Sequence, residues 1–404
     1  MAVAYPVMPP LHPVAGVRIG IASAGIKRPG RRDITLFELV EGSQCAAVFT
    51  RNAFCAAPVV LAKASLAQAT PRYLLINTGN ANAGTGSAGL NDAQRCCGAL
   101  AALLDCGAEQ VLPFSTGVIG EPLPVDKIIA TLPAAHLDLQ DDNWAAAAEA
   151  IMTTDTVSKG ESVQLQLGGR SITLTGIAKG SGMIRPDMGT MLAYVATDAA
   201  IEAALLQRLL QQAVDASFNR ITVDGDTSTN DACVLIATGQ SGLSLAEGSE
   251  ALSAFADALN DLMRRLAQRI VRDGEGATKF IAITVEEGGN EAECAAVAYT
   301  IAHSPLVKTA LFASDPNWGR ILAAVGRAGL DGLDLEAVHI FLDEVCIVHN
   351  GGRASSYTEA QGQAVMAKDE IAIRVLLGRG QASTTVWTCD LSYDYVKINA
   401  EYRS

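Results

Sequence analysis

The stretch Ala178-Lys179-Gly180-Ser181-Gly182-Met183-Ile184, which leads into Met188-Gly189-Thr190-Met191-Leu192, decides how this chain folds and what it does. Its glycines lack Cβ and permit backbone conformations that other residues avoid, as a strained peptide bond that is cut requires. We interpret the bond between Gly189 and Thr190 as a self-cleavage site. Thr190 would then carry a free α-amine beside its hydroxyl, and the amine can take the hydroxyl proton and make the oxygen a nucleophile.

The same segment holds a cation, Lys179, which could bind a substrate carboxylate or stabilise negative charge that develops during the reaction. An alternative interpretation is a glycine-rich connection between two strands. In that case Thr190 is an ordinary half-buried strand residue and Lys179 is solvated. The pattern of the segment alone favours the alternative, because short Gly, Ser and Thr runs are weakly specific.

Two further motifs have an arrangement that suits a reaction site. Thr116 and Gly117 follow the apolar run Val111-Leu112-Pro113-Phe114, where a strand is expected to end in a turn whose backbone N–H groups can point at one oxyanion. Glu275 lies between two glycines that allow a tight turn and can present its carboxylate to a cleft. The alternatives are a plain strand-to-loop turn and an acid on a surface loop.

The chain as a whole resembles the ornithine acetyltransferase (glutamate N-acetyltransferase) family of arginine biosynthesis. Besides the segment 178–192, seven motifs carry the resemblance in the expected order, at 24–27 (AGIK), 77–82 (NTGNAN), 115–120 (STGVIG), 153–156 (TTDT), 273–279 (DGEGATK), 315–320 (DPNWGR) and 399–402 (NAEY). One departure is that family members usually have alanine where Gly189 stands. Glycine at this position removes no reacting group, although it widens the freedom of the backbone.

The resemblance implies a layered α-β-β-α sandwich with two lobes that cuts itself into two chains. Residues 1–189 would form an alpha chain with the oxyanion hole and the cleavage segment, and residues 190–404 a beta chain with the nucleophile and substrate contacts. Two chains of each kind would assemble as a heterotetramer. The resemblance assigns the oxyanion hole to Thr116 and Gly117, and it assigns substrate binding to Thr153, Lys179, Thr190, Glu275, Asn399 and Ser404.

The implied reaction transfers the acetyl group of N-acetylornithine to glutamate through an acetyl-Thr190 intermediate, giving ornithine and N-acetylglutamate. Glu275 would bind the ammonium group of ornithine. Some members of the family also take acetyl from acetyl-CoA, which the residues leave open for this chain. A second function class stays open as well, an N-terminal threonine hydrolase such as an aminopeptidase or amidase, in which water accepts the acyl group.

Composition agrees with a cytoplasmic enzyme. The 404 residues suffice for two lobes, and 43 acidic against 30 basic residues give a net charge of −13, which argues against nucleic-acid or anionic-membrane binding. The nine cysteines form no CxxC pair and favour reduced thiols. The N-terminus lacks the pattern of a signal peptide.

Neither the five scattered histidines nor the segment 221–231 has the spacing of a metal site, so we expect no metal and no cofactor. The segment 221–231 is better interpreted as polar turns that line the substrate cleft.

Strands and helices are mixed along the whole chain. Apolar runs bounded by turn residues predict strands at 46–50 and 172–177, and an alanine-rich run predicts a helix over 144–152. Asp92 is expected to be the N-cap of a helix that stops at Gly107. Because the elements alternate without a strict βαβ rhythm, α/β layers are favoured over a doubly wound sheet.

Overall fold

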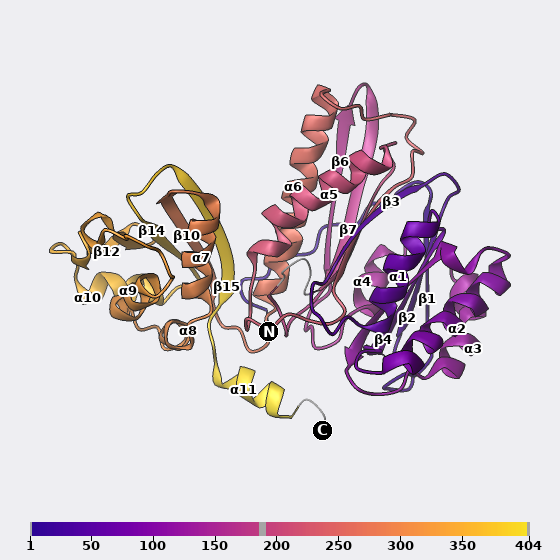
Figure 1. The fold of residues 1–404 in the computed structure, drawn as a ribbon, viewed down its shortest axis with the longest axis horizontal. Coiled ribbons are helices and arrows are strands. Elements are labelled where there is room, and N and C mark those ends of the chain that lie inside the picture. Colours follow the sequence, from indigo (N-terminus) through magenta and orange to yellow (C-terminus); the bar gives the residue numbers. More distant parts are fainter. Residues whose placement is uncertain (1, 186–190, 402–404) are drawn as a thin grey trace. The chain divides into compact units, whose positions relative to one another are not determined.

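The computed structural model describes residues 2–185 and 191–401, so the predictions on Gly189, Thr190 and Ser404 fall outside the described residues. The chain divides into two compact units, whose elements are labelled in Figure 1. The larger unit comprises Val7–Asn219 and Asp226–Ile270, and the smaller unit comprises Met1–Pro6, Arg220–Gly225 and Val271–Ser404. The expected chain boundary at 189/190 falls within the larger unit.

Two sheets form the larger unit. The first has the order β1-β2-β4-β5 and consists of β1 (Val17–Ala22), β2 (Ile34–Leu39), β4 (Tyr73–Asn80) and β5 (Val111–Val118). The second has the order β3-β9-β8-β7-β6 and consists of β3 (Gln44–Phe49), β9 (Ala232–Ala237), β8 (Leu192–Thr197), β7 (Arg170–Lys179) and β6 (Lys159–Leu167). The pairs β4–β5 and β8–β9 are parallel, and the remaining pairs of these two sheets are antiparallel.

The two sheets pack face to face. Phe37 on β2 and Phe114 on β5 each have their ring centroid 5.3 Å from that of Tyr194 on β8, so aromatic rings from both sheets meet in one core. Alternating apolar residues on each strand supply the rest of this core. Trp144, the first residue of α4 (Trp144–Ala150), packs against Phe37 at its edge.

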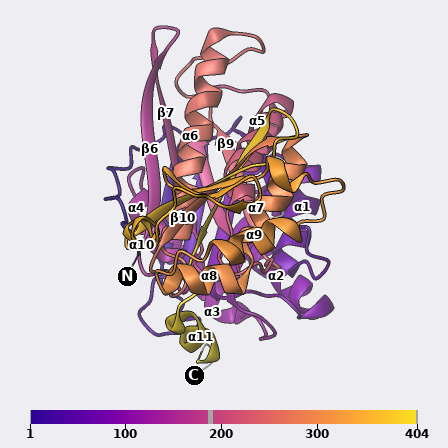
Figure 2. The ribbon, with the colours of Figure 1, turned by 90° about the vertical axis from the view of Figure 1, so that its left-hand side faces the viewer.

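Helices cover the outer face of each sheet. Leu100 of α2 (Gly86–Leu104) and Ile128 of α3 (Val125–Leu137) join a core with the first sheet, and α1 (Ala57–Gln68) lies beside β5. Figure 2 shows α6 (Glu250–Arg272) running alongside β6 and β7 of the second sheet, while α5 (Ala203–Ala216) covers β3 and β9. The predicted α-β-β-α layering is therefore confirmed.

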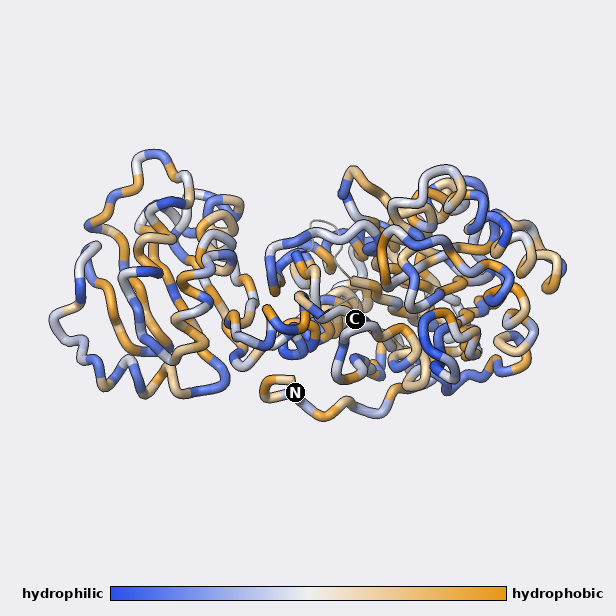
Figure 3. Tube along the Cα trace, turned by 90° about the horizontal axis from the view of Figure 1, so that it is seen from below, coloured by the Kyte–Doolittle hydropathy of each residue, from blue (hydrophilic) through white to orange (hydrophobic). Residues whose placement is uncertain are grey.

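The smaller unit contains one six-stranded sheet with helices packed on it. Its order is β13-β12-β11-β14-β10-β15, from β13 (Gly352–Arg353), β12 (Val345–His349), β11 (His339–Leu342), β14 (Glu370–Leu376), β10 (Phe280–Gly288) and β15 (Ala382–Cys389). The helices are α7 (Glu291–Ala302), α8 (Pro305–Phe312), α9 (Trp318–Gly326), α10 (Glu359–Met366) and α11 (Tyr393–Ala400). One apolar core joins this sheet to α7–α10, and Figure 3 shows hydrophobic stretches in the strands and hydrophilic ones in many connecting loops.

The strands predicted at 46–50 and 172–177 and the helix at 144–152 are confirmed as β3, β7 and α4. The predicted N-cap at Asp92 is wrong, because α2 begins at Gly86 with Thr85 as its N-cap. The Thr85 side chain lies so close to Gly89 that a Cβ at position 89 would be 1.9 Å from Thr85 Oγ1. This close approach explains a glycine near the start of the helix. Within residues 2–185 and 191–401, no helix is both long and apolar enough to cross a membrane.

Candidate active site

The parallel strands β4 and β5 end in an irregularity at the predicted oxyanion hole. Their register is regular up to the pair Gly79–Gly117 and then shifts at Asn80, which pairs with both Thr116 and Val118; we call this irregularity the bulge. Gly117 has φ +136°, and a Cβ there would lie 2.2 Å from the carbonyl carbon of Gly79, so only glycine fits. Thr116 and Gly117 thus lie within β5, not in a turn after it as predicted. A bulge redirects backbone groups away from the regular ladder.

Buried amide side chains hold this bulge in place. Ser115 Oγ donates to Asn77 Oδ1 at 2.5 Å, and Asn77 Nδ2 donates to the Asn80 carbonyl at 2.9 Å. Asn230, just before β9, donates from Nδ2 to the Ser115 carbonyl at 3.0 Å and so ties the second sheet to β5. Asn77, Asn80 and Ser115 lie in the motifs 77–82 and 115–120, but the sequence alone indicated no role for them. Asn230 belongs to the polar segment 221–231 that was expected to line a cleft.

Lys179, the last residue of β7, reaches the predicted oxyanion residue Thr116. Its Nζ donates a hydrogen bond to Thr116 Oγ1 at 3.1 Å. Lys179 is paired with Leu192 in the antiparallel register of β7 and β8, so the two flanks of the segment 180–191 lie side by side. The structure therefore brings Lys179 and Thr116 together next to the ends of the predicted cleavage segment.

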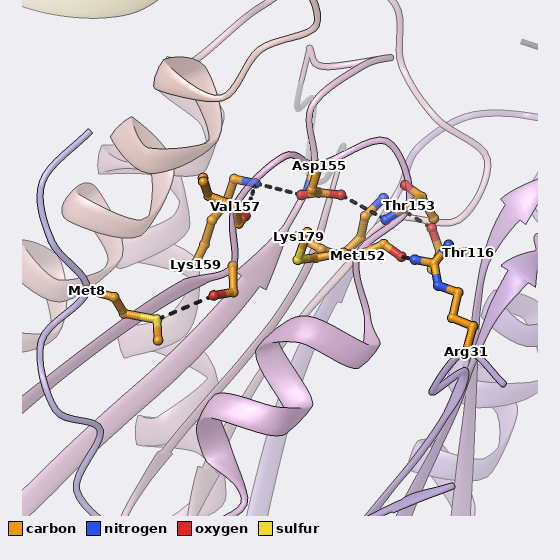
Figure 4. Close-up of polar contacts among 11 residues, drawn as sticks. Met8, Arg31, Thr116, Met152, Thr153, Asp155, Val157, Lys159 and Lys179 are labelled. Atoms are coloured by element: carbon orange, nitrogen blue, oxygen red, sulfur yellow. Dashed lines mark hydrogen bonds and ion pairs between the residues drawn. The ribbon is translucent and has the colours of Figure 1, made fainter. Parts of the chain in front are cut away.

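Thr153 follows α4 and is held by a buried carboxylate. Asp155 Oδ2 accepts a hydrogen bond from the Thr153 N–H at 2.9 Å, and Asp155 Oδ1 accepts one from Lys159 Nζ at 2.6 Å (Figure 4). Asp155 Oδ1 also accepts from the Gly180 N–H at 2.7 Å. Burial alone would raise the pKa of Asp155, but the positive charges of Lys159 and Lys179 and the hydrogen bonds outweigh it and hold the pKa well below the usual range. Asp155 is therefore ionised.

Asp231 is a second buried carboxyl group near Lys179. Desolvation raises the pKa of Asp231 well above its usual range, although hydrogen bonding from Ser228 and the charge of Lys179 act in the opposite direction. Among the residues that the structure describes, Asp231 Oδ2 has no hydrogen-bond partner. Sequence reasoning placed Asp231 in a polar turn and gave it no role. A buried carboxyl with a perturbed pKa beside predicted site residues is a typical feature of an active site.

The smaller unit brings together two other predicted site residues. Asn399 Nδ2 on α11 donates to Glu275 Oε2 at 2.9 Å, and the Glu275 residue is only 8% exposed. The turn beside Glu275 depends on Gly276, which has φ +69° and where a Cβ would lie 2.4 Å from the Tyr395 backbone nitrogen. Ser392 Oγ, the N-cap of α11, donates to the Gly276 carbonyl at 2.5 Å. The C-terminal helix is thus fastened to the Glu275 turn.

The described residues hold the predicted site in two groups. Thr116, Gly117, Thr153 and Lys179 belong to the larger unit, and Glu275 and Asn399 belong to the smaller one. Within the described ranges, no three or more His, Cys, Asp or Glu side chains gather as a candidate metal site. The side chains and backbone of the two groups offer hydroxyl, carboxyl, ammonium and N–H groups.

Comparisons with known proteins agree on one family. The chain is 60% identical over 407 aligned residues to the arginine biosynthesis bifunctional protein ArgJ of Pseudomonas fluorescens (strain Pf0-1), with all of both chains covered. It is 62% identical over 395 residues to the protein of the same name from Methylococcus capsulatus (strain ATCC 33009 / NCIMB 11132 / Bath), covering 98% of this chain and 97% of that one.

A solved structure supports the same assignment. The crystal structure of the arginine biosynthesis bifunctional protein ArgJ from Bacillus halodurans has a TM-score of 0.51 and 40% identity, and the match covers 53% of this chain and all of that chain. The model of the ArgJ family matches residues 18–404. Because this match spans nearly the whole sequence and includes each predicted site residue, the chain belongs to the ArgJ family.

Proposed function

We propose that this protein is a self-processing acetyltransferase that moves the acetyl group of N-acetylornithine to glutamate, and that it also transfers acetyl from acetyl-CoA to glutamate. The observation that carries the proposal is the contact between Lys179 and Thr116. Lys179 ends β7, the strand that precedes the Thr190 segment, and Thr116 lies near the end of β5. Family membership supports it further, since the curated relatives are named bifunctional proteins of arginine biosynthesis.

Maturation begins when Thr190 Oγ attacks the carbonyl carbon of Gly189. The C–N bond breaks, the nitrogen of Thr190 takes the proton, and an ester joins Gly189 to Thr190 Oγ. Water then hydrolyses the ester, which leaves a carboxylate on Gly189 and a free hydroxyl and amine on Thr190. Two chains result, 1–189 and 190–404.

Acetyl transfer uses the same oxygen. Thr190 Oγ attacks the acetyl carbon of N-acetylornithine while the α-amine of Thr190 takes the hydroxyl proton. The oxyanion of the tetrahedral intermediate is stabilised at Thr116 and Gly117. The amide C–N bond breaks, the proton passes to the leaving nitrogen, and ornithine departs. The amine of glutamate then attacks the acetyl ester and releases N-acetylglutamate, and Thr190 Oγ regains its proton.

Each substrate group has a proposed partner. Lys179 and Thr153 bind the end of the substrate that ornithine and glutamate share, and the ammonium of Lys179 also stabilises the developing negative charge beside Thr116. Glu275, held by Asn399, binds the side-chain ammonium of ornithine. Ser404 completes the set of contacts. Two alpha and two beta chains form the working assembly.

The proposal is tested by the intact mass of the purified protein and by transfer assays. We expect two chains, the second beginning Thr-Met-Leu-Ala-Tyr, and N-acetylglutamate formed from N-acetylornithine with parallel double-reciprocal lines. Thr190→Ala protein should stay uncut and inactive, whereas Thr190→Ser protein should be cut in part. Active uncut protein would refute the nucleophile. Equal release of acetate with and without glutamate would identify a hydrolase instead.

A separate assay tests the acetyl-CoA half of the proposal. Incubation of the processed enzyme with acetyl-CoA and glutamate should yield N-acetylglutamate and free CoA thiol. Loss of this activity in the Thr190→Ala variant would tie it to the same nucleophile. If enzyme that is active with N-acetylornithine released no thiol from acetyl-CoA, N-acetylornithine would be its acetyl donor and the acetyl-CoA half of the proposal would be wrong.

A further inference from the structure

A single carboxylate connects two separate segments of the candidate site. Asp155 accepts hydrogen bonds from the backbone N–H of Thr153 and from the ammonium of Lys159 on β6 (Figure 4). It also accepts one from the backbone N–H of Gly180. The side chains of Asp155 and Lys159 are both 0% exposed. Gly180 follows directly after Lys179, and Thr153 stands 26 positions before Lys179 in the sequence. Asp155 therefore joins backbone segments that bear two predicted substrate contacts.

Stability alone is a weak reason to bury this charge pair. Taking two charges out of water costs several kcal/mol per ion, and well-packed apolar side chains often replace such pairs without loss of stability. What an apolar pair cannot supply is two acceptor oxygens on one rigid group. An ionised carboxylate accepts several strong hydrogen bonds at once, which fixes the positions of their donors relative to each other.

The Gly180 backbone makes this connection demanding. Gly180 has φ +150°, and a Cβ there would lie 2.9 Å from Ile184 Cδ1, so the chain leaves β7 in a conformation that suits glycine. The hydrogen bond from its N–H to Asp155 holds that conformation at 2.7 Å. Lys179, whose Nζ reaches Thr116, is thereby fixed at the point where the cleavage segment begins.

We infer that Asp155, with Lys159 as its counter-ion, is a positioning residue that sets the geometry of Thr153 and of the Lys179–Gly180 turn. The inference rests on the proposed function and adds a residue to it. Among the described residues, Asp155 holds two backbone N–H groups and the Lys159 ammonium, and it acts through the groups that it holds. It serves both stages, because the turn leads into the bond that is cut and Lys179 and Thr153 bind substrate afterwards.

The two variants to compare both carry Lys159→Met and differ only at position 155, which is a carboxylate in one and an amide in the other. Lys159→Met leaves both carboxylate oxygens of Asp155 in place for the two backbone N–H groups, but it removes the counter-ion of a buried charge and is expected to cost stability by itself. Asp155→Asn/Lys159→Met has an amide in place of the carboxylate, so one backbone N–H faces an NH₂ group and loses its acceptor. The matched control is Glu161→Gln/Arg269→Met, which neutralises another buried pair, between Glu161 on β6 and Arg269 on α6, joined at 2.5 Å.

The measurements are the rate of chain cleavage, followed by mass, and kcat and KM for N-acetylornithine in the processed fraction. Both variants at Lys159 should fold. We expect Asp155→Asn/Lys159→Met to be cut at least about tenfold more slowly than Lys159→Met, and to have a KM raised about fivefold or more, as expected for loss of about one hydrogen bond. The control should stay within about twofold of the wild type. Lys159→Met should lie between the wild type and the double variant, because it leaves a buried carboxylate without its counter-ion.

Two outcomes would overturn the inference. One is cleavage and KM in Asp155→Asn/Lys159→Met equal to those of Lys159→Met. The other is a double variant that unfolds where Lys159→Met and the control remain folded, which would place the role of Asp155 in stability. Failure of the proposed function looks different, because wild-type protein would then stay uncut.

Discussion

The ammonium of Lys179 and the hydroxyl of Thr116 lie 3.1 Å apart, which joins the end of β7 to the bulged end of β5. A positive charge is thereby held beside the residue proposed to stabilise the oxyanion. A charge at this distance interacts far more strongly in a partly desolvated site than in water. This pair is accordingly the first target for mutation.

Replacing Lys179 with methionine should lower kcat of the processed enzyme by ~10²–10³, as the loss of one oxyanion donor does in known acyl-transfer sites. Lys179→Arg keeps the charge and should recover part of the rate. The assay is acetyl transfer from N-acetylornithine at saturating substrate. A rise in KM with an unchanged kcat would show that Lys179 only binds substrate.

Gly117→Ala should destabilise the protein by about 1–3 kcal/mol, because the new Cβ would lie 2.2 Å from the Gly79 carbonyl carbon at a φ of +136°. Gly120→Ala is the matched control. Gly120 also has a positive φ, +84°, but no atom lies within 4 Å of the Cβ that would be added. Thermal unfolding of both variants in an uncut Thr190→Ala background compares them. Equal destabilisation would mean that φ, and not the close approach, governs position 117.

Asp231→Asn should change how stability depends on pH. Burial raises the pKa of Asp231 in the folded state, so the wild-type protein loses stability as the pH rises from the unfolded pKa, near 4, to the folded pKa. The slope is at most about 1.4 kcal/mol per pH unit. Below pH 4 the stability difference between the variant and the wild type should be constant, and above pH 4 it should shift steadily in favour of the variant. Urea unfolding at pH 4, 5.5 and 7 measures the difference, and a constant difference at all three would contradict the raised pKa.

Glu275→Gln should raise the KM for N-acetylornithine more than the KM for glutamate. The carboxylate favours the cationic side chain of ornithine, while glutamate has an anionic one. The Asn399 amide, 2.9 Å from Glu275 Oε2, can donate to the carboxylate of the wild type and to the amide oxygen of the variant. The turn itself should therefore persist. Steady-state kinetics for both substrates decide the matter. Equal effects on the two would place Glu275 at the amino-acid end that both share.

The strands and the α/β layering could be predicted from the sequence because they depend on local pattern. Apolar runs such as those of β3 and β7 indicate strands wherever they occur. The start of α2 could not be predicted in this way, since Gly86 and Gly89 look like helix breakers. The side chain of Asn82 stabilises that start from outside the helix by donating to the Gly89 carbonyl at 2.9 Å.

The site was predictable where motif residues carry the chemistry and not where distant residues hold them. Thr116 with Lys179, and Glu275 with Asn399, were singled out from their motifs, and each pair is in contact. Asn230 and Asp155 were missed as supporting residues. Asn230 reaches Ser115 across 115 positions and Asp155 reaches Gly180 across 25, and no local spacing indicates such contacts. Their roles, like those of the motif residues, stay predictions that the variants above test.

The strand order β3-β9-β8-β7-β6 has a consequence for the proposed cut at 189/190. Strands β3, β7 and β6 then belong to one polypeptide, and β8 and β9 of the other polypeptide lie between them. Neither polypeptide could close the sheet alone, so unfolding of the cut enzyme would also be a dissociation and its refolding a second-order reaction. Uncut Thr190→Ala protein should regain its fold at a rate independent of dilution. The refolding rate of the cut enzyme should fall as the protein is diluted. The cut would therefore make refolding depend on protein concentration, so that a cut molecule that unfolds in dilute solution would rarely regain its fold.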